Sequence, residues 1–146
     1  MNKYLIFTFL ILIISFTACN KNNSEIIGGA DSPTLITVTE KGENLMYKQI
    51  TPKEAKDIMD SGEEYVLLDV REQYEYDEKH IPGAILIPYT QIDNNAEEMI
   101  PDKDKLILVY CRSGRRSKIA SESLVKIGYT NVKEFGGIID WPYETV

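Results

Sequence analysis

The sequence predicts an α/β protein with a mainly parallel sheet of about five strands, flanked by helices on both faces. Two observations lead to this prediction. Short apolar runs such as 66–70 and 106–110 alternate along the chain with segments of helical character. Turn residues and the start and stop signals of helices divide these segments into short elements. The 146 residues are enough for one domain of this kind.

The first predicted elements have local reasons in the sequence. After a short strand at 47–50, the residues Thr51, Pro52 and Glu54 suit the N-cap, N1 and N3 positions of a helix and form a capping box. This helix is expected to stop at Gly62, because glycine commonly follows the last turn of a helix. The next predicted elements are a strand at 66–70, a short helix at 72–78, a strand at 85–87 and a helix at 90–100.

The second half of the chain contains the most apolar strand. Residues 106–110 read Leu-Ile-Leu-Val-Tyr and are predicted to form the central strand of the sheet. A helix is expected at 117–127, ending at Gly128, and a last strand at 132–135 precedes Gly136-Gly137. The globular domain is therefore expected to span residues 46–146.

The first 18 residues have the composition of a bacterial export signal. Lys3 precedes an apolar run, 5–16, which is shorter than the roughly 20 residues of a membrane span but suits a secretory signal. The sequence Phe16-Thr17-Ala18-Cys19 resembles a bacterial lipoprotein box, although that family prefers leucine where Phe16 stands. The resemblance implies that Cys19 carries lipid such as palmitate and anchors an extracytoplasmic protein to a bacterial membrane. A buried N-terminal helix is the alternative.

Residues 19–45 differ in character from the domain that follows. They contain several turn-forming residues around Gly28-Gly29, and the segment 35–39 has strand propensity. We expect a tether or partly ordered extension here, or an additional edge strand.

Charge and cysteine content narrow the possible functions. The net charge is −7 and no basic stripe extends along the chain, so a nucleic-acid partner is not expected. The two cysteines are Cys19 and Cys111. If Cys19 carries lipid, Cys111 is a free thiol, and a lone thiol outside the cytoplasm is unusual unless the protein uses it.

A basic loop surrounds this thiol. Cys111 directly follows the apolar strand, and Arg112, Arg115 and Arg116 lie within the next five residues. Open α/β folds bind ligands where a strand ends and a helix begins. Guanidinium charges and the N–H groups of a helix N-terminus stabilise a thiolate, which indicates an activated nucleophile in an anion-binding loop. The alternative is a cysteine that only packs in the core.

The residues from about 47 to 141 resemble the rhodanese family of sulfurtransferases. The resemblance rests on motifs in the expected order, namely Leu67-Leu68-Asp69-Val70-Arg71-Glu72, Glu75-Tyr76, His80-Ile81-Pro82-Gly83-Ala84, the cysteine loop, and Gly136-Gly137-Ile138 before Trp141-Pro142. The loop from Cys111 to Arg116 has the Cys-x4-Arg length of sulfur-transferring members, whereas related phosphatases have Cys-x5-Arg. Lys79 departs from the glycine that many members carry.

The resemblance implies a single rhodanese-like domain without a metal or cofactor, and we expect a monomer. Cys111 would take the sulfane sulfur of a small anionic donor, thiosulfate or polysulfide, as a persulfide and pass it to cyanide or a thiol. The other roles it implies are substrate binding by Arg112, Ser113, Gly114, Arg115 and Arg116, with Arg116 also closing the loop, and structural support by Asp69 and Arg71. His80 is expected to pack or to hydrogen-bond in a turn.

Two other functions remain open at this point. One is a non-catalytic module that binds sulfur or a partner protein, although such a module would not need Cys111. The other is a cysteine-based phosphatase or arsenate reductase, which the loop length disfavours.

Overall fold

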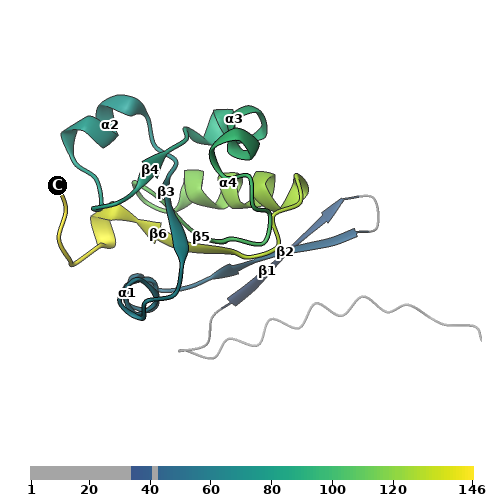
Figure 1. The fold of residues 1–146 in the computed structure, drawn as a ribbon, viewed down its shortest axis with the longest axis horizontal. Coiled ribbons are helices and arrows are strands. Elements are labelled where there is room, and N and C mark those ends of the chain that lie inside the picture. The colour runs from purple at the N-terminus through teal and green to yellow at the C-terminus, as the bar shows by residue number, and fades with distance from the viewer. Residues whose placement is uncertain (1–33, 41–42) are drawn as a thin grey trace, which may run out of the picture. The chain divides into compact units, whose positions relative to one another are not determined.

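The computed structural model describes residues 34–40 and 43–146, with side chains from residue 46 onward (Figure 1). The elements in chain order are β1 (Thr34–Glu40), β2 (Glu43–Gln49), α1 (Pro52–Asp60), β3 (Tyr65–Asp69), α2 (Gln73–Glu78), β4 (Ile85–Leu86), the 3₁₀ turn η1 (Tyr89–Gln91), α3 (Ile92–Met99), β5 (Leu106–Cys111), α4 (Arg115–Lys126), β6 (Val132–Gly137) and the 3₁₀ turn η2 (Ile138–Asp140). Strands and helices alternate from β2 onward.

The strands form one sheet in the order β1-β2-β6-β5-β3-β4. All neighbours from β2 to β4 run parallel, and β1 adds an antiparallel edge strand to β2. Strand β5 lies between β6 and β3, so the residue at its carboxyl end is flanked by the ends of two other strands. The predicted α/β fold with a mainly parallel sheet is confirmed, and the strand propensity of 35–39 corresponds to β1.

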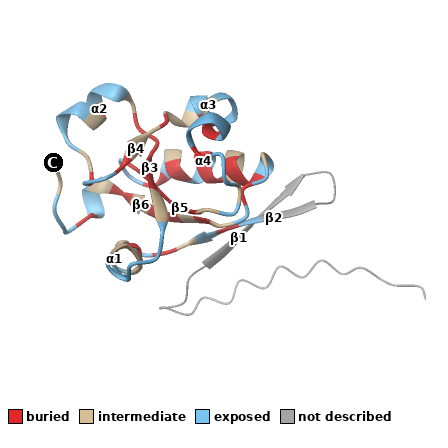
Figure 2. Ribbon diagram, in the orientation of Figure 1, coloured by how far each residue is buried: buried red, intermediate tan, exposed pale blue. Residues whose placement is uncertain are grey.

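Side chains of β5 alternate between two hydrophobic cores. Ile107, Val109 and Cys111 pack into the core that contains residues of α3 and α4. Leu106, Leu108 and Tyr110 pack on the opposite face, with residues of α1 and with Phe135 and Trp141. All six residues of β5 are buried (Figure 2). Helices on both faces therefore hold the strand that ends at the cysteine.

Helix α1 begins as its sequence predicts. The Thr51 hydroxyl accepts a hydrogen bond from the Glu54 N–H at 3.2 Å, and the Thr51 N–H donates to the Glu54 carboxylate at 2.7 Å. Pro52 occupies the first turn, where its missing N–H costs no helical bond.

The start of α4 was predicted two residues too late. The helix begins at Arg115 and not at 117. Gly114 has a φ of +94°, a left-handed conformation that favours glycine, and turns the chain from the loop directly into the helix. Arg115 and Arg116 therefore belong to the first turn of α4.

The signal predicted at 1–18 and the lipid predicted on Cys19 concern a part of the chain that lies outside the described residues. Over 34–40 and 43–146, the structure contains no helix with the length and apolar character needed to cross a membrane.

Candidate active site

Cys111 is the last residue of β5, and its side chain is buried at 1% exposure. The chain turns sharply after it, and the N–H of Gly114 donates a hydrogen bond to Sγ at 3.1 Å. The sulfur thus lies beneath the loop 112–114, at the N-terminus of α4. N–H groups that converge in this way form a cradle for an anion.

The pKa of the Cys111 thiol is lowered from its ordinary value. Burial acts in the opposite direction and raises the pKa, but hydrogen bonds from the Ser117 hydroxyl and from the N–H groups of Ser117, Ser113 and Gly114 outweigh it. Hydrogen bonds to the charged form favour that form. Main-chain N–H groups and one hydroxyl therefore lower the pKa of the thiol. The sequence predicts this effect from guanidinium charge and from the helix N-terminus together.

Arg116 is held by α2 rather than turned toward an incoming anion. Its two terminal nitrogens donate to the two carboxylate oxygens of Glu75 at 2.5 and 2.8 Å. The hydrogen bond from Arg116 lowers the pKa of Glu75 to about 2, even though burial opposes the shift. Arg116 also lies within electrostatic reach of Cys111. It closes the loop by joining the first turn of α4 to α2.

The other two arginines of the loop are exposed. Arg112 and Arg115 make no ion pair within the part of the chain that the structure describes. Ser113 between them is exposed as well. Arg112 and Arg115 therefore offer their charge to solvent next to the buried sulfur.

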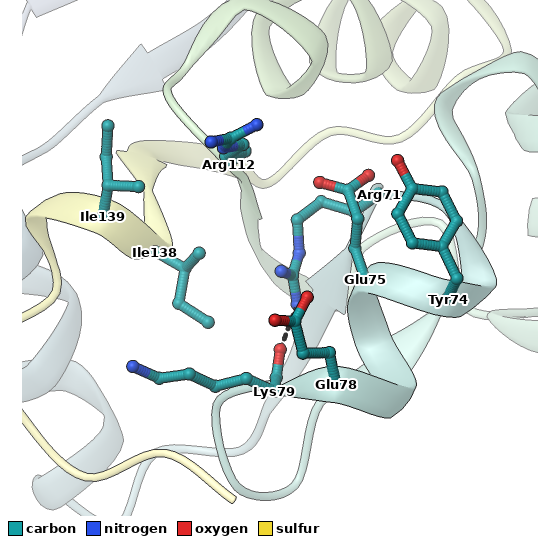
Figure 3. A pocket seen from close by; sticks show the side chains of 8 residues that line it. All are labelled: Arg71, Tyr74, Glu75, Glu78, Lys79, Arg112, Ile138 and Ile139. Carbon is teal, nitrogen blue, oxygen red and sulfur yellow. Dashed lines mark hydrogen bonds between the residues drawn. The ribbon is translucent and has the colours of Figure 1, made fainter.

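A pocket of about 450 Å³ opens beside the loop. In Figure 3 the side chain of Arg112 lies on one side of it, the carboxylates of α2 lie on another, and the Lys79 side chain extends toward Ile138. The residues that line the pocket are Arg71, Tyr74, Glu75, Glu78, Lys79, Arg112, Ile138 and Ile139. The pocket thus combines both signs of charge with apolar surface, and neither Cys111 nor Arg115 lines it.

Asp69 and Arg71 form a buried ion pair at the carboxyl end of β3. The Arg71 guanidinium donates to the Asp69 carboxylate at 2.9 and 2.6 Å, and it also donates to the carbonyl oxygen of Lys79 at 2.6 Å. The pair therefore ties the end of the strand to the segment that follows α2. His80 hydrogen-bonds through Nδ1 to the Tyr76 carbonyl at 2.9 Å and stacks on the Tyr76 ring, so the expected packing role is confirmed.

The sequence does not single out Glu134, and it indicates Gly137 only as part of a family motif. Glu134 on β6 is completely buried, and its Oε1 accepts hydrogen bonds from the Ser117 hydroxyl at 2.6 Å and the Gly136 N–H at 2.8 Å. A signal for it existed, because a charged residue two positions after Val132 in a predicted strand faces the same side as that apolar residue. Gly137 of the Gly136-Gly137-Ile138 motif lies with its Cα against the backbone of Arg112.

The chain belongs to the family of rhodanese-like domains, whose match spans residues 51–142. It is 40% identical over 73 residues to the thiosulfate sulfurtransferase PspE of Escherichia coli, a match that covers 50% of this chain and 70% of that protein. It is 38% identical over 93 residues to the probable adenylyltransferase/sulfurtransferase MoeZ of Mycobacterium tuberculosis. That match covers 63% of this chain but only 24% of the relative.

Solved structures show the same fold. One of them, described as a rhodanese with anions from E. coli, is 36% identical with a TM-score of 0.53. The match covers 56% of this chain and 96% of that structure. The cysteine loop and strands β3 to β6 therefore lie within the matched rhodanese-like domain.

Proposed function

We propose that the protein is a sulfurtransferase of the thiosulfate sulfurtransferase type, in which Cys111 carries sulfur as a persulfide. The observation that carries this proposal is the buried Cys111 sulfur under the N–H groups of a six-residue loop, with a lowered thiol pKa. The relative PspE, named as a thiosulfate sulfurtransferase, supports the reaction class.

The first half-reaction loads the cysteine. The Cys111 thiolate attacks the outer sulfur of thiosulfate, a new S–S bond forms, and the S–S bond of thiosulfate breaks. Sulfite leaves with the electron pair, and Cys111 becomes a persulfide with one negative charge. The loop N–H groups stabilise this charge without reorganising, as donors of an anion hole do.

The second half-reaction returns the enzyme to its starting state. Cyanide or a thiolate attacks the outer sulfur of the persulfide and takes it, and the Cys111 thiolate leaves with the electron pair. With cyanide the product is thiocyanate. The two half-reactions share one covalent intermediate and give ping-pong kinetics. Polysulfide is an alternative donor that uses the same steps.

The exposed arginines serve the approach of the donor. Arg112 and Arg115 attract a dianion such as thiosulfate, whereas Arg116 is engaged by Glu75. Attraction of this kind raises the local concentration of an anion and accelerates its encounter with the site.

The intact mass of the protein tests the proposal. The full chain with Cys19→Ser is measured before and after thiosulfate, so that Cys111 is its single thiol. We expect a gain of one sulfur atom that cyanide removes and that the additional change Cys111→Ser abolishes. Absence of the gain with both thiosulfate and polysulfide refutes the persulfide and favours a non-catalytic module.

We further propose that Cys19 anchors the protein by lipid to the outer side of a bacterial membrane. The support is the sequence Phe16-Thr17-Ala18-Cys19 after an apolar run. Incorporation of labelled palmitate in a bacterial host, compared between the natural chain and Cys19→Ser, tests this. Equal labelling of both proteins contradicts the anchor.

A further inference from the structure

Glu134 is a buried acid with an incomplete set of partners. It lies on β6 with no exposed surface, and within the described residues it forms no ion pair. Oε1 accepts two hydrogen bonds, but Oε2 is buried without a partner. A carboxylate removed from water at a core position is costly unless it is compensated. Its position next to the cysteine loop suggests a role beyond packing.

Ser117 connects this carboxylate to the cysteine. Its hydroxyl lies 2.6 Å from Glu134 Oε1, 3.0 Å from the Gly114 carbonyl oxygen and 3.3 Å from the Gly136 carbonyl oxygen. The same hydroxyl is among the groups that lower the pKa of the Cys111 thiol, against the effect of burial. A hydroxyl group has one proton to donate and two lone pairs that accept. The single proton can therefore go to Glu134, which is the closest of these oxygen acceptors, to a neighbouring carbonyl oxygen or to Cys111, but only to one of them at a time.

We propose that Glu134 is a positioning residue that controls the nucleophile through Ser117. While Cys111 is a thiol, the Ser117 proton points to the Glu134 carboxylate and the oxygen lone pairs face the sulfur. When Cys111 becomes a thiolate or a persulfide, the hydroxyl rotates and donates to the sulfur. Glu134 then loses a hydrogen bond, and its negative charge repels the charge on sulfur. Glu134 therefore raises the pH at which Cys111 becomes reactive.

Two ion pairs lie near the cysteine loop. From α4 and α2, Arg116 and Glu75 neutralise each other. From the end of β3, Asp69 and Arg71 do the same. Among the side chains of residues 46–146, Glu134 is the buried carboxyl group that these two pairs leave without a cationic partner.

On the β2 side, Tyr47 packs near Glu134. Burial, and the charges of Glu122 and Glu134, raise the pKa of Tyr47 to about 12, so this tyrosine is neutral at physiological pH. Tyr47 therefore adds no charge next to Glu134 and Cys111. The exposed guanidinium groups of Arg112 and Arg115 lie on the solvent side of the loop and are common to all the variants below.

The inference deepens the proposed function, and its test needs no sulfur donor. The rate of alkylation by iodoacetamide is measured against pH for the full chain with Cys19→Ser, which leaves Cys111 as the single thiol. Failure of the persulfide assay would thus not affect this measurement, and the reverse also holds.

The isosteric variant Glu134→Gln removes the charge and keeps an oxygen acceptor. We expect its alkylation profile to shift to lower pH by about one unit, because a like charge near the thiolate is removed. Glu134→Asp retains the charge and should restore most of the original profile. An unchanged profile in Glu134→Gln overturns the proposal.

A double-mutant cycle tests whether Ser117 is the link. Ser117→Ala should shift the profile to higher pH, because the thiolate loses a donor. In the Ser117→Ala background, Glu134→Gln should have a smaller effect than alone, as expected for coupled residues. An equal effect in both backgrounds contradicts coupling through the hydroxyl.

Matched controls distinguish the effect of Glu134 on Cys111 from a general loss of structure. Ser121 lies one turn further along α4 and is equally buried, and its hydroxyl has no hydrogen-bond partner within the described residues. Ser121→Ala, and Glu122→Gln on the same helix, should leave the alkylation profile unchanged. A shift in either control of the size seen in Glu134→Gln overturns the specific role of Glu134.

Discussion

Gly137 lies so close to Arg112 that a methyl group on its Cα would stand 2.1 Å from the Arg112 carbonyl oxygen. The end of β6 thus passes directly beneath the cysteine loop. The φ of Gly137 is −130°, which is accessible to any residue. Glycine is therefore required by the close packing and not by the backbone conformation. The same carbonyl oxygen accepts a hydrogen bond from the Ile139 N–H at 3.3 Å. The backbone at the end of β6 therefore packs directly against the loop and limits its movement.

Gly137→Ala is expected to displace the loop. Overpacking of a tight site costs about 1–3 kcal/mol of stability, and a displaced Arg112 carbonyl moves the N–H groups next to it. We expect the rate of persulfide formation with thiosulfate to fall at least about tenfold, which corresponds to a rise of roughly 1.4 kcal/mol in the activation free energy. Intact mass and thermal unfolding measure the two effects.

Gly62→Ala is the control for this substitution. Gly62 follows α1, has a φ of +82° and has no atom within 4 Å of an added Cβ. Alanine there should cost about 1–2 kcal/mol through strain and leave persulfide formation intact. Full activity of Gly137→Ala would show that the loop tolerates a methyl group at this position and would contradict the prediction.

The exposed arginines should act on donor binding. With Arg112→Ala and Arg115→Ala combined, KM for thiosulfate is expected to rise about tenfold, or roughly 1.4 kcal/mol, with a smaller change in kcat. Added salt should diminish the difference, because exposed charges are screened. Steady-state kinetics at two salt concentrations measure this.

Lys118→Ala provides the comparison, because Lys118 is an exposed cation further along α4. It should leave KM nearly unchanged. An equal rise in KM for Lys118→Ala would mean that general positive charge, and not the position of the two arginines, attracts the donor.

Stability at acid pH should depend on Glu75. Its folded-state pKa of about 2 lies below the ordinary value of 4.5. A lowered carboxyl pKa stabilises the folded state fully above the unfolded value, and this contribution is lost as the pH falls from about 4.5 toward 2. Glu75→Gln should lower stability at pH 7 by about 1–3 kcal/mol and flatten the decline below pH 4.5.

Urea unfolding between pH 7 and pH 2.5 measures this prediction. Glu98→Gln, which alters an exposed carboxylate of α3, should retain the full decline of the natural chain. A decline in Glu75→Gln as steep as in the natural chain would contradict the assignment to this ion pair.

The capping box of α1 should contribute to stability but not to chemistry. Thr51→Ala removes the side-chain acceptor of the Glu54 N–H and should cost about 1 kcal/mol. Lys53→Ala, which removes an exposed pair with Asp57, should cost less, as exposed ion pairs contribute little. Urea unfolding compares the two variants. If Thr51→Ala transfers sulfur more slowly at a temperature where it is folded, the capping box also affects the chemistry and the prediction is wrong.

Features set by neighbouring residues were predictable from the sequence. The capping box depends on residues three positions apart, and the burial of β5 follows from five consecutive apolar side chains. The cysteine loop follows a buried strand and could be located for the same reason. The start of α4 was misjudged because a glycine in the N-cap position, with a φ of +94°, lets the helix begin directly after the loop.

Features set by distant residues were not predictable in this way. The contact between Gly137 and Arg112 depends on how β6 pairs with β5, and that pairing is irregular between Val109 and Cys111. The position of Glu134 against Ser117 depends in addition on how α4 packs on the sheet. The alternation of the strand could indicate that Glu134 is buried, but not which hydroxyl it meets.

Apart from Arg112, which belongs to both, the pocket and the thiol cradle are made by different stretches of chain. The cradle is formed by β5 and the start of α4, whereas much of the pocket wall belongs to α2 and η2. Tyr74, Glu78 and Ile139 can therefore be randomised in a small library while the nucleophile and Glu75 remain unaltered. For the sulfur transfer proposed above, such a library tests whether residues of α2 and η2 affect the choice of donor and acceptor while Cys111 stays unchanged.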